Sequence, residues 1–491
     1  MLAILLMSFI LVFLLWFYYY KQFLYWKNRG VPQDDTVPIF GSLKNVLLLQ
    51  QSLGEYLKEL HNKSTSPYTG FYIMQEPALL INDPQLVQQV LVKVFNNFSN
   101  RTTVSDSGID KMSAYILFNS KSPLWNQIRK KINPVFSSGK IKGMFHLIDE
   151  NTDDLMTHVK TNGPIINTRD VFARFTTDVI SSTCFGINAN SLKIPEAEFR
   201  KVSFRLFDMV KFAVAVPQLL YFLMPTIVKV LRIRFLDGYC LDFLRRVFYS
   251  TLTERRGTKS FRNDLIDILI QIKNNETPDD PIKLDDDMLL AQCVQFFVAG
   301  FETTSSSLTY LSYELAKHPH IQRKLKNEVR EVLKKHGDFS HCDFLKDLNY
   351  MDLCIKESLR LRPILNFLDR RCTETVQIPG TNLVIEKGTP VYISLFGLHH
   401  NEKYHQDAKA FKPERWLEPH TNFTYMPFGE GPRTCVGQRF ALTAMKTAMA
   451  KLLAEYTIEM TEKTPKETCP IEEKSTLTIL KEILYLKVVK D

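Results

Sequence analysis

The chain begins with an uninterrupted apolar stretch. Residues 1–20 carry no charged side chain, and Ser8 is the only clearly polar residue before the tyrosines. Twenty apolar residues form a helix about 30 Å long, which is enough to cross a bilayer. Tyr18 to Tyr20 resemble an interfacial aromatic belt, and Lys21 starts a basic flank that favours a cytosolic body. We predict an N-terminal transmembrane anchor over residues 1–20, because a cleaved signal peptide needs a basic start and a small-residue cleavage site that are missing here.

Helical patterns dominate the chain behind this anchor. Residues 21–41 are basic and contain prolines, which indicates an extended connector. Short alternating runs predict strands, and Asp83-Pro84 predicts the start of a helix. We expect mostly helix from 145 to 335, including a helix at 288–317, and further helices at 345–362 and 437–455. We expect strands at 70–74 and 78–82 and a final strand within 476–489. No repeat or long linker interrupts residues 42–491, so we expect a single, mainly α domain with small β-sheets.

Residues 203–235 are more apolar than the predicted helices around them. Pro217 and Pro225 divide this stretch, which fits two core helices separated by a proline break. The same composition also fits a second contact with the membrane and an apolar lid over a binding pocket. The pattern alone leaves both interpretations open.

The cysteines and the net charge describe the setting in which the chain works. Eight cysteines are scattered over 491 residues and none forms a C-x-x-C pair, which is typical of a reduced, cytosolic protein. The net charge of +9 fits a generic solvated surface, and it equally fits attraction to an anionic membrane or an acidic partner protein. We predict no nucleic-acid partner.

The common nucleotide-binding and hydrolase motifs are missing from the sequence. Gly139-Lys140 is followed by Ile141 and is therefore no phosphate-binding loop, and no strand-linked G-x-G-x-x-G, H-E-x-x-H or G-x-S-x-G occurs. A redox enzyme with this sequence binds neither flavin nor nicotinamide by these routes. We therefore expect its electrons to come from another protein.

Residues 428–437, Phe-Gly-Glu-Gly-Pro-Arg-Thr-Cys-Val-Gly, contain the clearest candidate chemistry. They place Cys435 on a glycine-rich turn at the start of a predicted helix, where backbone N–H groups favour a metal-binding thiolate. Gly431 and Gly437 permit close approach of a flat ligand, and Arg433 can bind a carboxylate at its edge. A haem with propionate groups fits this description. The alternative is a buried structural cysteine beside a turn.

These residues resemble the haem-binding signature of the cytochrome P-450 family of haem-thiolate monooxygenases. The resemblance extends from about residue 30 to the end of the chain, and four further motifs follow the family's order: Trp125-Asn-Gln-Ile-Arg129, Ala299-Gly-Phe-Glu-Thr-Thr304, Glu357-Ser-Leu-Arg360 and Phe411-Lys-Pro-Glu-Arg-Trp416. It implies the cytochrome P-450 fold and haem b, with the Cys435 thiolate as axial ligand. It also implies that the haem contacts include Phe428, Gly429, Arg433, Gly437, Trp125, Arg129, Arg370 and Ala299.

Two neighbouring arginines compete for one role that the resemblance implies. Arg370 aligns with the second propionate-binding arginine of the family, and Arg371 follows it directly. The sequence does not decide between them.

A charged network is expected to support the chain that leads into the Cys435 loop. Glu357 and Arg360 lie one helical turn apart, and the resemblance adds Arg415 as the residue that completes their ion network. His399 lies in a segment that resembles the family's L-H-x-D-P, although Asn401-Glu402 replaces Asp-Pro here. We interpret His399 as a structural hydrogen-bonding residue and assign no chemistry to the network.

Glu302 and Thr303 are unusual residues for the middle of a long apolar helix. A carboxylate and a hydroxyl there are costly unless they are paired or solvated. Thr303 can donate to a carbonyl of the preceding turn, and Gly300 is expected to let the helix open locally and hold water. This arrangement would deliver protons to oxygen at the haem. The alternative is a satisfied polar patch in a core helix.

The resemblance implies an enzyme that inserts one oxygen atom of O₂ into a lipophilic small molecule. NADPH–cytochrome P-450 reductase is the expected electron donor, with cytochrome b5 as a second candidate, and the body is expected to face the cytosol at the endoplasmic reticulum membrane, in the microsomal fraction. Docking is expected on a basic face of Arg129, Lys130, Lys131, Arg439 and Lys446. Two alternatives are a peroxide-rearranging haem-thiolate enzyme and a non-catalytic, membrane-anchored haem binder.

The substrate is the least determined part of this interpretation. By position in the family pattern, the pocket draws on residues 112–118, 204–212, 297–301, 365–368 and 476–477, most of which are apolar. The segment at 367–373 and the connector resemble insect microsomal members that act on foreign compounds. An endogenous steroid, fatty acid or hormone is the alternative substrate class.

Overall fold

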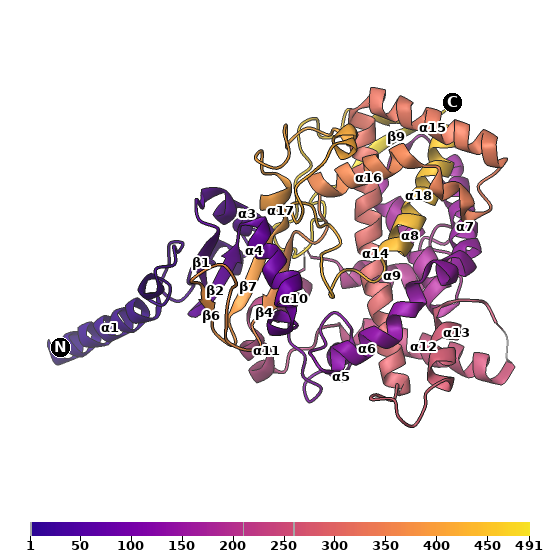
Figure 1. Ribbon diagram of the computed structural model, residues 1–491. Coiled ribbons are helices and arrows are strands. Elements are labelled where there is room, and N and C mark those ends of the chain that lie inside the picture. Colours follow the sequence, from indigo (N-terminus) through magenta and orange to yellow (C-terminus); the bar gives the residue numbers. More distant parts are fainter. Residues whose placement is uncertain (1, 210, 259–260) are drawn as a thin grey trace.

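The computed structural model describes residues 2–209, 211–258 and 261–491, and helices make up most of it (Figure 1). Residue 1 of the predicted anchor and residue 210 of the apolar stretch lie outside this description. The helices are α1 (Leu2–Gln22), α2 (Lys44–Leu47), α3 (Leu53–Lys63), α4 (Pro84–Gln88), α5 (Lys111–Tyr115), α6 (Leu124–Ile132), α7 (Ser138–Thr161), α8 (Thr168–Ile180), α9 (Glu198–Leu206), α10 (Phe212–Leu223), α11 (Pro225–Leu231), α12 (Gly238–Thr258), α13 (Leu265–Asn274), α14 (Asp286–Lys317), α15 (Pro319–His336), α16 (Asn349–Leu361), α17 (Leu395–His399) and α18 (Gln438–Glu455).

Three small sheets accompany the helices in the described part of the chain. The largest has the order β1-β2-β7-β4, in which β2 and β7 are parallel and the other neighbours are antiparallel. A second sheet has the order β3-β9-β8, and β5 and β6 form a hairpin. The strands are β1 (Tyr68–Ile73), β2 (Glu76–Ile81), β3 (Ile165–Asn167), β4 (Phe367–Arg371), β5 (Val376–Gln377), β6 (Val384–Ile385), β7 (Pro390–Ser394), β8 (Tyr456–Met460) and β9 (Tyr485–Lys490). The predicted class, mainly α with small β-sheets, is confirmed.

α14 is the central element of the helical part (Figure 1). Asp285 caps it, because its carboxylate accepts a hydrogen bond from the N–H of Met288 at 2.7 Å. Most of its side chains are buried, and its largest interface is with α8. The helix predicted at 288–317 is therefore present and begins two residues earlier than expected.

Of the two prolines in the apolar stretch at 203–235, Pro217 does not end a helix. It lies inside α10, and the break falls between α10 and α11, where Pro225 starts a new helix. Pro225 occupies the first helical position, where the missing N–H costs nothing. The final predicted strand is also shorter than expected, because only its C-terminal part forms β9.

Much of the predicted connector, residues 21–41, packs on the sheet next to α1. Trp26 is fully buried, and its indole N–H donates to the carbonyl of Phe71 at 3.3 Å. A Cβ atom added at Gly70 would lie 2.4 Å from the Trp26 ring, so glycine is required at this contact. Arg29 forms an ion pair with Glu386 at 2.6 Å. The boundaries drawn at residues 20 and 41 stay predictions.

α1 projects away from the sheet at one end of the molecule (Figure 1). Many of its large apolar side chains are exposed, including Ile4, Met7 and Phe9. In the part of the chain that the structure describes, no helix reaches the length and apolar character required to span a bilayer.

Candidate active site

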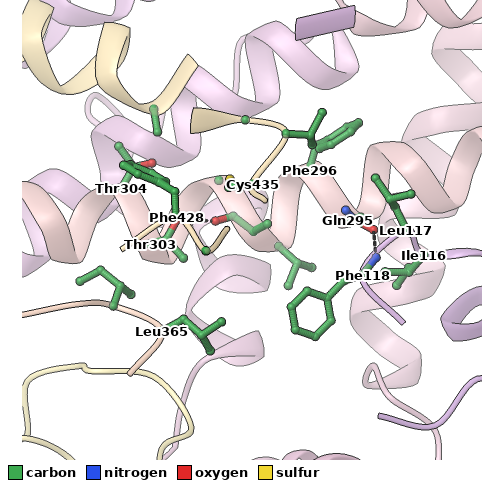
Figure 2. Close-up of a pocket in the computed structure, with 18 of the residues that line it drawn as sticks. Ile116, Leu117, Phe118, Gln295, Phe296, Thr303, Thr304, Leu365, Phe428 and Cys435 are labelled. Atoms are coloured by element: carbon green, nitrogen blue, oxygen red, sulfur yellow. Dashed lines mark hydrogen bonds between the residues drawn. The ribbon is translucent and has the colours of Figure 1, made fainter. Parts of the chain in front are cut away.

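A cavity of about 360 Å³ lies between the Cys435 loop and the middle of α14. Figure 2 shows Thr303 and Thr304 toward one end of the drawn residues and Gln295 and Phe118 toward the other. Each of the five segments expected to form a pocket supplies at least one lining residue. Leu206 and Phe207, which follow each other at the end of α9, and Phe222 of α10 are among them. The apolar stretch at 203–235 therefore covers part of the cavity.

Cys435 faces this cavity from a tight turn that ends at α18. Its N–H donates to the carbonyl of Phe428 at 2.8 Å and closes the turn. Gly431 has a φ of 74°, and a Cβ atom there would lie 2.1 Å from the carbonyl oxygen of Leu91, so no other residue fits. Phe428, Gly429 and Gly437 line the same wall. The turn thus places Cys435 among cavity-lining residues that include two glycines.

The thiol is accessible because it borders the cavity, although protein surrounds it on the other sides. Burial raises the pKa of the Cys435 thiol. The backbone N–H of Gly437, the guanidinium of Arg129 and the N–H of Gln438 act in the opposite direction. These groups favour the thiolate, and a bound metal ion would favour it further.

The middle of α14 forms the opposite wall. Ala299 is exposed although it lies in the centre of a long helix, because its side chain faces the cavity. Thr303 also lines the cavity, and its hydroxyl donates to the carbonyl of Ala299 at 2.6 Å, as predicted. The predicted local opening is not found, since α14 is continuous. Gly300 instead permits close packing, because a Cβ atom there would lie 2.5 Å from Cδ1 of Ile180 in α8.

Glu302 is buried and is not among the residues that line the cavity. Its carboxylate accepts a hydrogen bond from Ser306 at 3.0 Å and lies 3.4 Å from the guanidinium of Arg169 in α8. Burial raises the pKa of Glu302, while Arg169 and Ser306 lower it. The structure therefore brings Thr303 to the cavity and places Glu302 against α8. The catalytic role of Glu302 stays a prediction.

Four arginines and no acidic residue line the cavity within the described chain: Arg101, Arg129, Arg370 and Arg433. The Nε atoms of Arg129 and Arg370 are buried without a hydrogen-bond partner in this part of the chain. Burial lowers the pKa of Arg370 to about 9, with a further contribution from Arg101, while Asp369 opposes the shift. A buried guanidinium such as that of Arg370, which forms no salt bridge within the described chain, is costly. The wall therefore suits a ligand that carries carboxylates.

Arg370 and Arg371 lie on opposite sides of β4. Side chains alternate along β4, so Arg370 points inward and is fully buried. Arg371 points outward, where it pairs with Glu76 at 2.8 Å and donates to the carbonyl of Gly388. Arg370 is therefore the arginine of this pair that faces the cavity.

Arg433 and Arg101 hold the loop that precedes α6. The Arg433 guanidinium stacks over the ring of Trp125 at 4.2 Å and donates to the carbonyls of Ser99 and Ser120 at 2.7 and 2.8 Å. Arg101 pairs with Asp369 at 2.7 Å. Most N–H groups of Arg433 thus already have protein partners. Arg101 was missed by the sequence reasoning, because no motif distinguishes it from other loop arginines.

The predicted charged network is present and fully buried at its centre. Glu357 lies 2.8 Å from both Arg360 and Arg415. It also accepts hydrogen bonds from the N–H of Lys412 at 3.0 Å and the indole of Trp416 at 3.1 Å. The other N–H groups of Arg360 donate to backbone carbonyls, which are those of His399, Ala408 and Ala410. The network fixes several loops around one buried carboxylate.

His399 behaves as the structural residue that was predicted. Its Nε2 accepts a hydrogen bond from the N–H of Met426 at 2.9 Å, two residues before Phe428. Burial lowers the pKa of His399 well below its ordinary value, so the ring is neutral. The charged network and His399 thus tie α16 and α17 to the start of the Cys435 turn.

Comparison with known proteins agrees with this geometry. Residues 31–487 match the model of the cytochrome P-450 family. The chain belongs to the cytochrome P-450 family. It is 36% identical to cytochrome P-450 6k1 of Blattella germanica, over 91% of this chain and 90% of that protein. Cytochrome P-450 6j1 of the same insect is 36% identical (90% and 89% covered), and the probable cytochrome P-450 6g2 of Drosophila melanogaster is 33% identical (96% and 95% covered).

A cytochrome P-450 is a monooxygenase that binds haem through a cysteine thiolate, and the cavity fits that group. Cys435 supplies a thiol that is exposed to the cavity, whereas Cys184, which also lines it, is buried, and burial raises its pKa to about 12. Arg129 and Arg370 line the cavity with guanidinium groups suited to the propionates. Of the two cysteines that line the cavity in the described chain, Cys435 is the candidate for the axial thiolate.

Proposed function

We propose that this cytochrome P-450 oxidises lipophilic small molecules, foreign compounds among them, with electrons that NADPH–cytochrome P-450 reductase or cytochrome b5 delivers. The observation that carries the proposal is the cavity itself, which has Cys435 on one wall and Thr303 on the other. Its remaining lining is mostly apolar and aromatic, with side chains such as Phe118, Phe207 and Phe222. Such a lining binds lipophilic molecules by removing apolar surface from water.

The residues around the cavity would hold the haem in one orientation. Arg129 and Arg370 would bind its propionates with charge-assisted hydrogen bonds, and Cys435 would coordinate its iron. Phe428, Gly429 and Gly437 would lie against one face, and Ala299 would lie against the other. When bound, the haem supplies an iron centre that accepts electrons and activates O₂.

Thr303 would hold a proton donor near the reacting oxygen. Its hydroxyl hydrogen is engaged by the carbonyl of Ala299, so its lone pairs remain for a water in the cavity. Glu302 would supply protons only after turning away from Arg169 and Ser306, or through intervening waters. Its raised pKa suits a carboxyl group that carries a proton at intervals.

The membrane anchor remains part of this proposal. The exposed apolar side chains of α1 support it, and Phe212 of α10 and Leu231 of α11 add exposed apolar surface on the body. We place the protein at the endoplasmic reticulum membrane with its body in the cytosol. The exposed side chains of α10 and α11 also favour the second membrane contact that the sequence left open.

The reductase would dock on a smaller basic surface than the sequence suggested. Arg129 faces the cavity, Lys131 pairs with Glu276 and Asp280, and Lys446 pairs with Asp352. Lys130 and Arg439 are exposed, and neither one forms a salt bridge within the described chain. These two residues are the best candidates for contact with an acidic flavoprotein.

The variant Lys130→Glu/Arg439→Glu reverses the two exposed charges. Reduction of this protein by the reductase should then be about 10-fold slower at low salt, because electrostatic steering is lost. Stopped-flow reduction under carbon monoxide measures this rate. Lys387→Glu, which changes an exposed lysine two residues after β6, is the matched control. An unchanged rate in the double variant would contradict docking at this surface.

The test of the proposed activity is turnover with purified reductase. NADPH consumption, O₂ uptake and a hydroxylated product should appear together with a lipophilic substrate. Turnover with a hydroperoxide alone, and none with NADPH, would favour the peroxide-rearranging alternative. No turnover under either condition would favour the non-catalytic haem binder.

A further inference from the structure

Gln295 is a polar residue in an apolar part of the cavity. It lies on α14, one turn before Ala299 and two turns before Thr303, and all three side chains line the cavity. Figure 2 shows Gln295 beside Phe118 and Leu117, with Phe296 nearby and Thr303 farther along. A carboxamide in such surroundings needs hydrogen-bond partners, because leaving it unpaired costs about 1–3 kcal/mol. Its position in the cavity was not predicted from the sequence.

The orientation of the Gln295 amide is fixed by the backbone of the facing loop. Its Oε1 accepts a hydrogen bond from the N–H of Phe118 at 2.9 Å. An N–H can only donate, so the oxygen must be the atom on that side. Nε2 then points elsewhere, and it donates no hydrogen bond to another residue of the described chain. It is also not one of the buried unpaired atoms, so it is accessible from the cavity.

Gln218 provides an internal comparison. It also lines the cavity, from α10. Its Nε2 already donates to the carbonyl of Leu206 at 3.3 Å. One N–H group of Gln218 therefore remains, whereas Gln295 keeps both of its N–H groups available for a ligand.

We propose that Gln295 Nε2 binds a hydrogen-bond acceptor on the substrate. The preferred substrates then carry a carbonyl, ester or ether oxygen at one end of a lipophilic body. Two helical turns separate Gln295 from Thr303, which corresponds to about 12 Å along α14. The carbon that is oxidised should lie about that far from the acceptor. The proposal rests on the proposed function and names the substrate class for the same site.

A matched pair of compounds tests the assignment. 4-Acetyl-4′-methylbiphenyl carries a carbonyl at one end, and 4-isopropenyl-4′-methylbiphenyl has the same shape with a methylene group in place of the oxygen. Equilibrium dialysis measures their affinity for the full-length, haem-loaded protein. The wild type should bind the ketone about 5- to 10-fold more tightly than the hydrocarbon, which is the usual effect of one neutral hydrogen bond.

The variant Gln295→Leu should lose this preference by weakening the ketone alone. Gln218→Leu should change the affinities for both compounds by the same factor and so keep their ratio. During turnover, the wild type should hydroxylate the methyl group at the far end of the ketone, and Gln295→Leu should yield a mixture of products. The preference of the wild type tests the proposal even if a variant does not fold.

Two results would overturn the assignment. Equal affinity of the wild type for both compounds would show that Nε2 binds no acceptor. If Gln295→Leu lowers the affinities for both compounds by the same factor, Gln295 only holds the Phe118 loop. The proposed function fails separately, through the turnover assay described above, since dialysis requires no catalysis.

Discussion

Replacing Glu357 with glutamine is expected to lower the free energy of unfolding by about 3–5 kcal/mol, the cost of breaking a buried ion pair by removing one charge. Arg360 and Glu357 are both fully buried, and Arg415 shares the same carboxylate. Four groups donate hydrogen bonds to Glu357, those of Arg360, Arg415, Lys412 and Trp416. Glutamine offers one oxygen, and its NH₂ group would face donors. The variant therefore leaves the buried Arg360 and the partly buried Arg415 without a counter-charge.

The matched control is Asp407→Asn, which removes a carboxylate from the same region. Asp407 pairs with Lys412, but both side chains are more than half exposed. Exposed ion pairs contribute only about 0–1 kcal/mol. Chemical denaturation of the haem-loaded proteins, followed by circular dichroism, measures both variants. A loss in Glu357→Gln no larger than in Asp407→Asn would show that the network is not an important source of stability.

Replacing Arg370 with leucine is expected to change haem binding and stability in opposite directions. In the apoprotein, the variant removes a buried cation that forms no salt bridge within the described chain, so the free energy of unfolding should stay the same or rise. In the haem-loaded protein, it would remove the charge-assisted hydrogen bond that we propose between Arg370 and a propionate. Such bonds contribute about 1.5–3 kcal/mol, so haem affinity should fall about 10- to 100-fold. Transfer of haem to an acceptor protein measures this loss.

Arg371→Leu is the adjacent control for this experiment. Arg371 pairs with Glu76 on the outer side of β4 and does not line the cavity. Its replacement should leave haem affinity unchanged. If Arg371→Leu releases haem as readily as Arg370→Leu, the two arginines do not divide their roles as β4 suggests. A loss of apoprotein stability in Arg370→Leu would show that Asp369 and the nearby backbone outweigh the cost of burying this cation.

Local signals in the sequence predicted the helices well. Asp83 caps α4 as expected, and Asp285 caps α14 in the same way, because a capping carboxylate acts on N–H groups two or three residues away. The Cys435 turn was predicted from equally local signals, since its glycines and the N–H groups of α18 lie within a few residues of the sulfur. Signals of this kind do not depend on which distant segment packs nearby.

Long-range contacts explain what the sequence could not predict. Gln295 faces a loop 177 residues away, and Arg101 pairs with Asp369 across 268 residues. Lys131 and Lys446 were expected on a docking surface, but acidic residues from other segments pair with them. The position of Glu302 also depends on α8, which carries Arg169. Each of these results follows from packing between elements rather than from spacing within one element.

The most direct test of the central claim is the carbon monoxide difference spectrum of the reduced protein. The account predicts the red-shifted Soret band of a thiolate-ligated haem in the wild type, and its loss in Cys435→Ser. A wild-type spectrum typical of nitrogen-ligated haem, or a thiolate band that persists in Cys435→Ser, would contradict Cys435 as the axial ligand and with it the proposed active site.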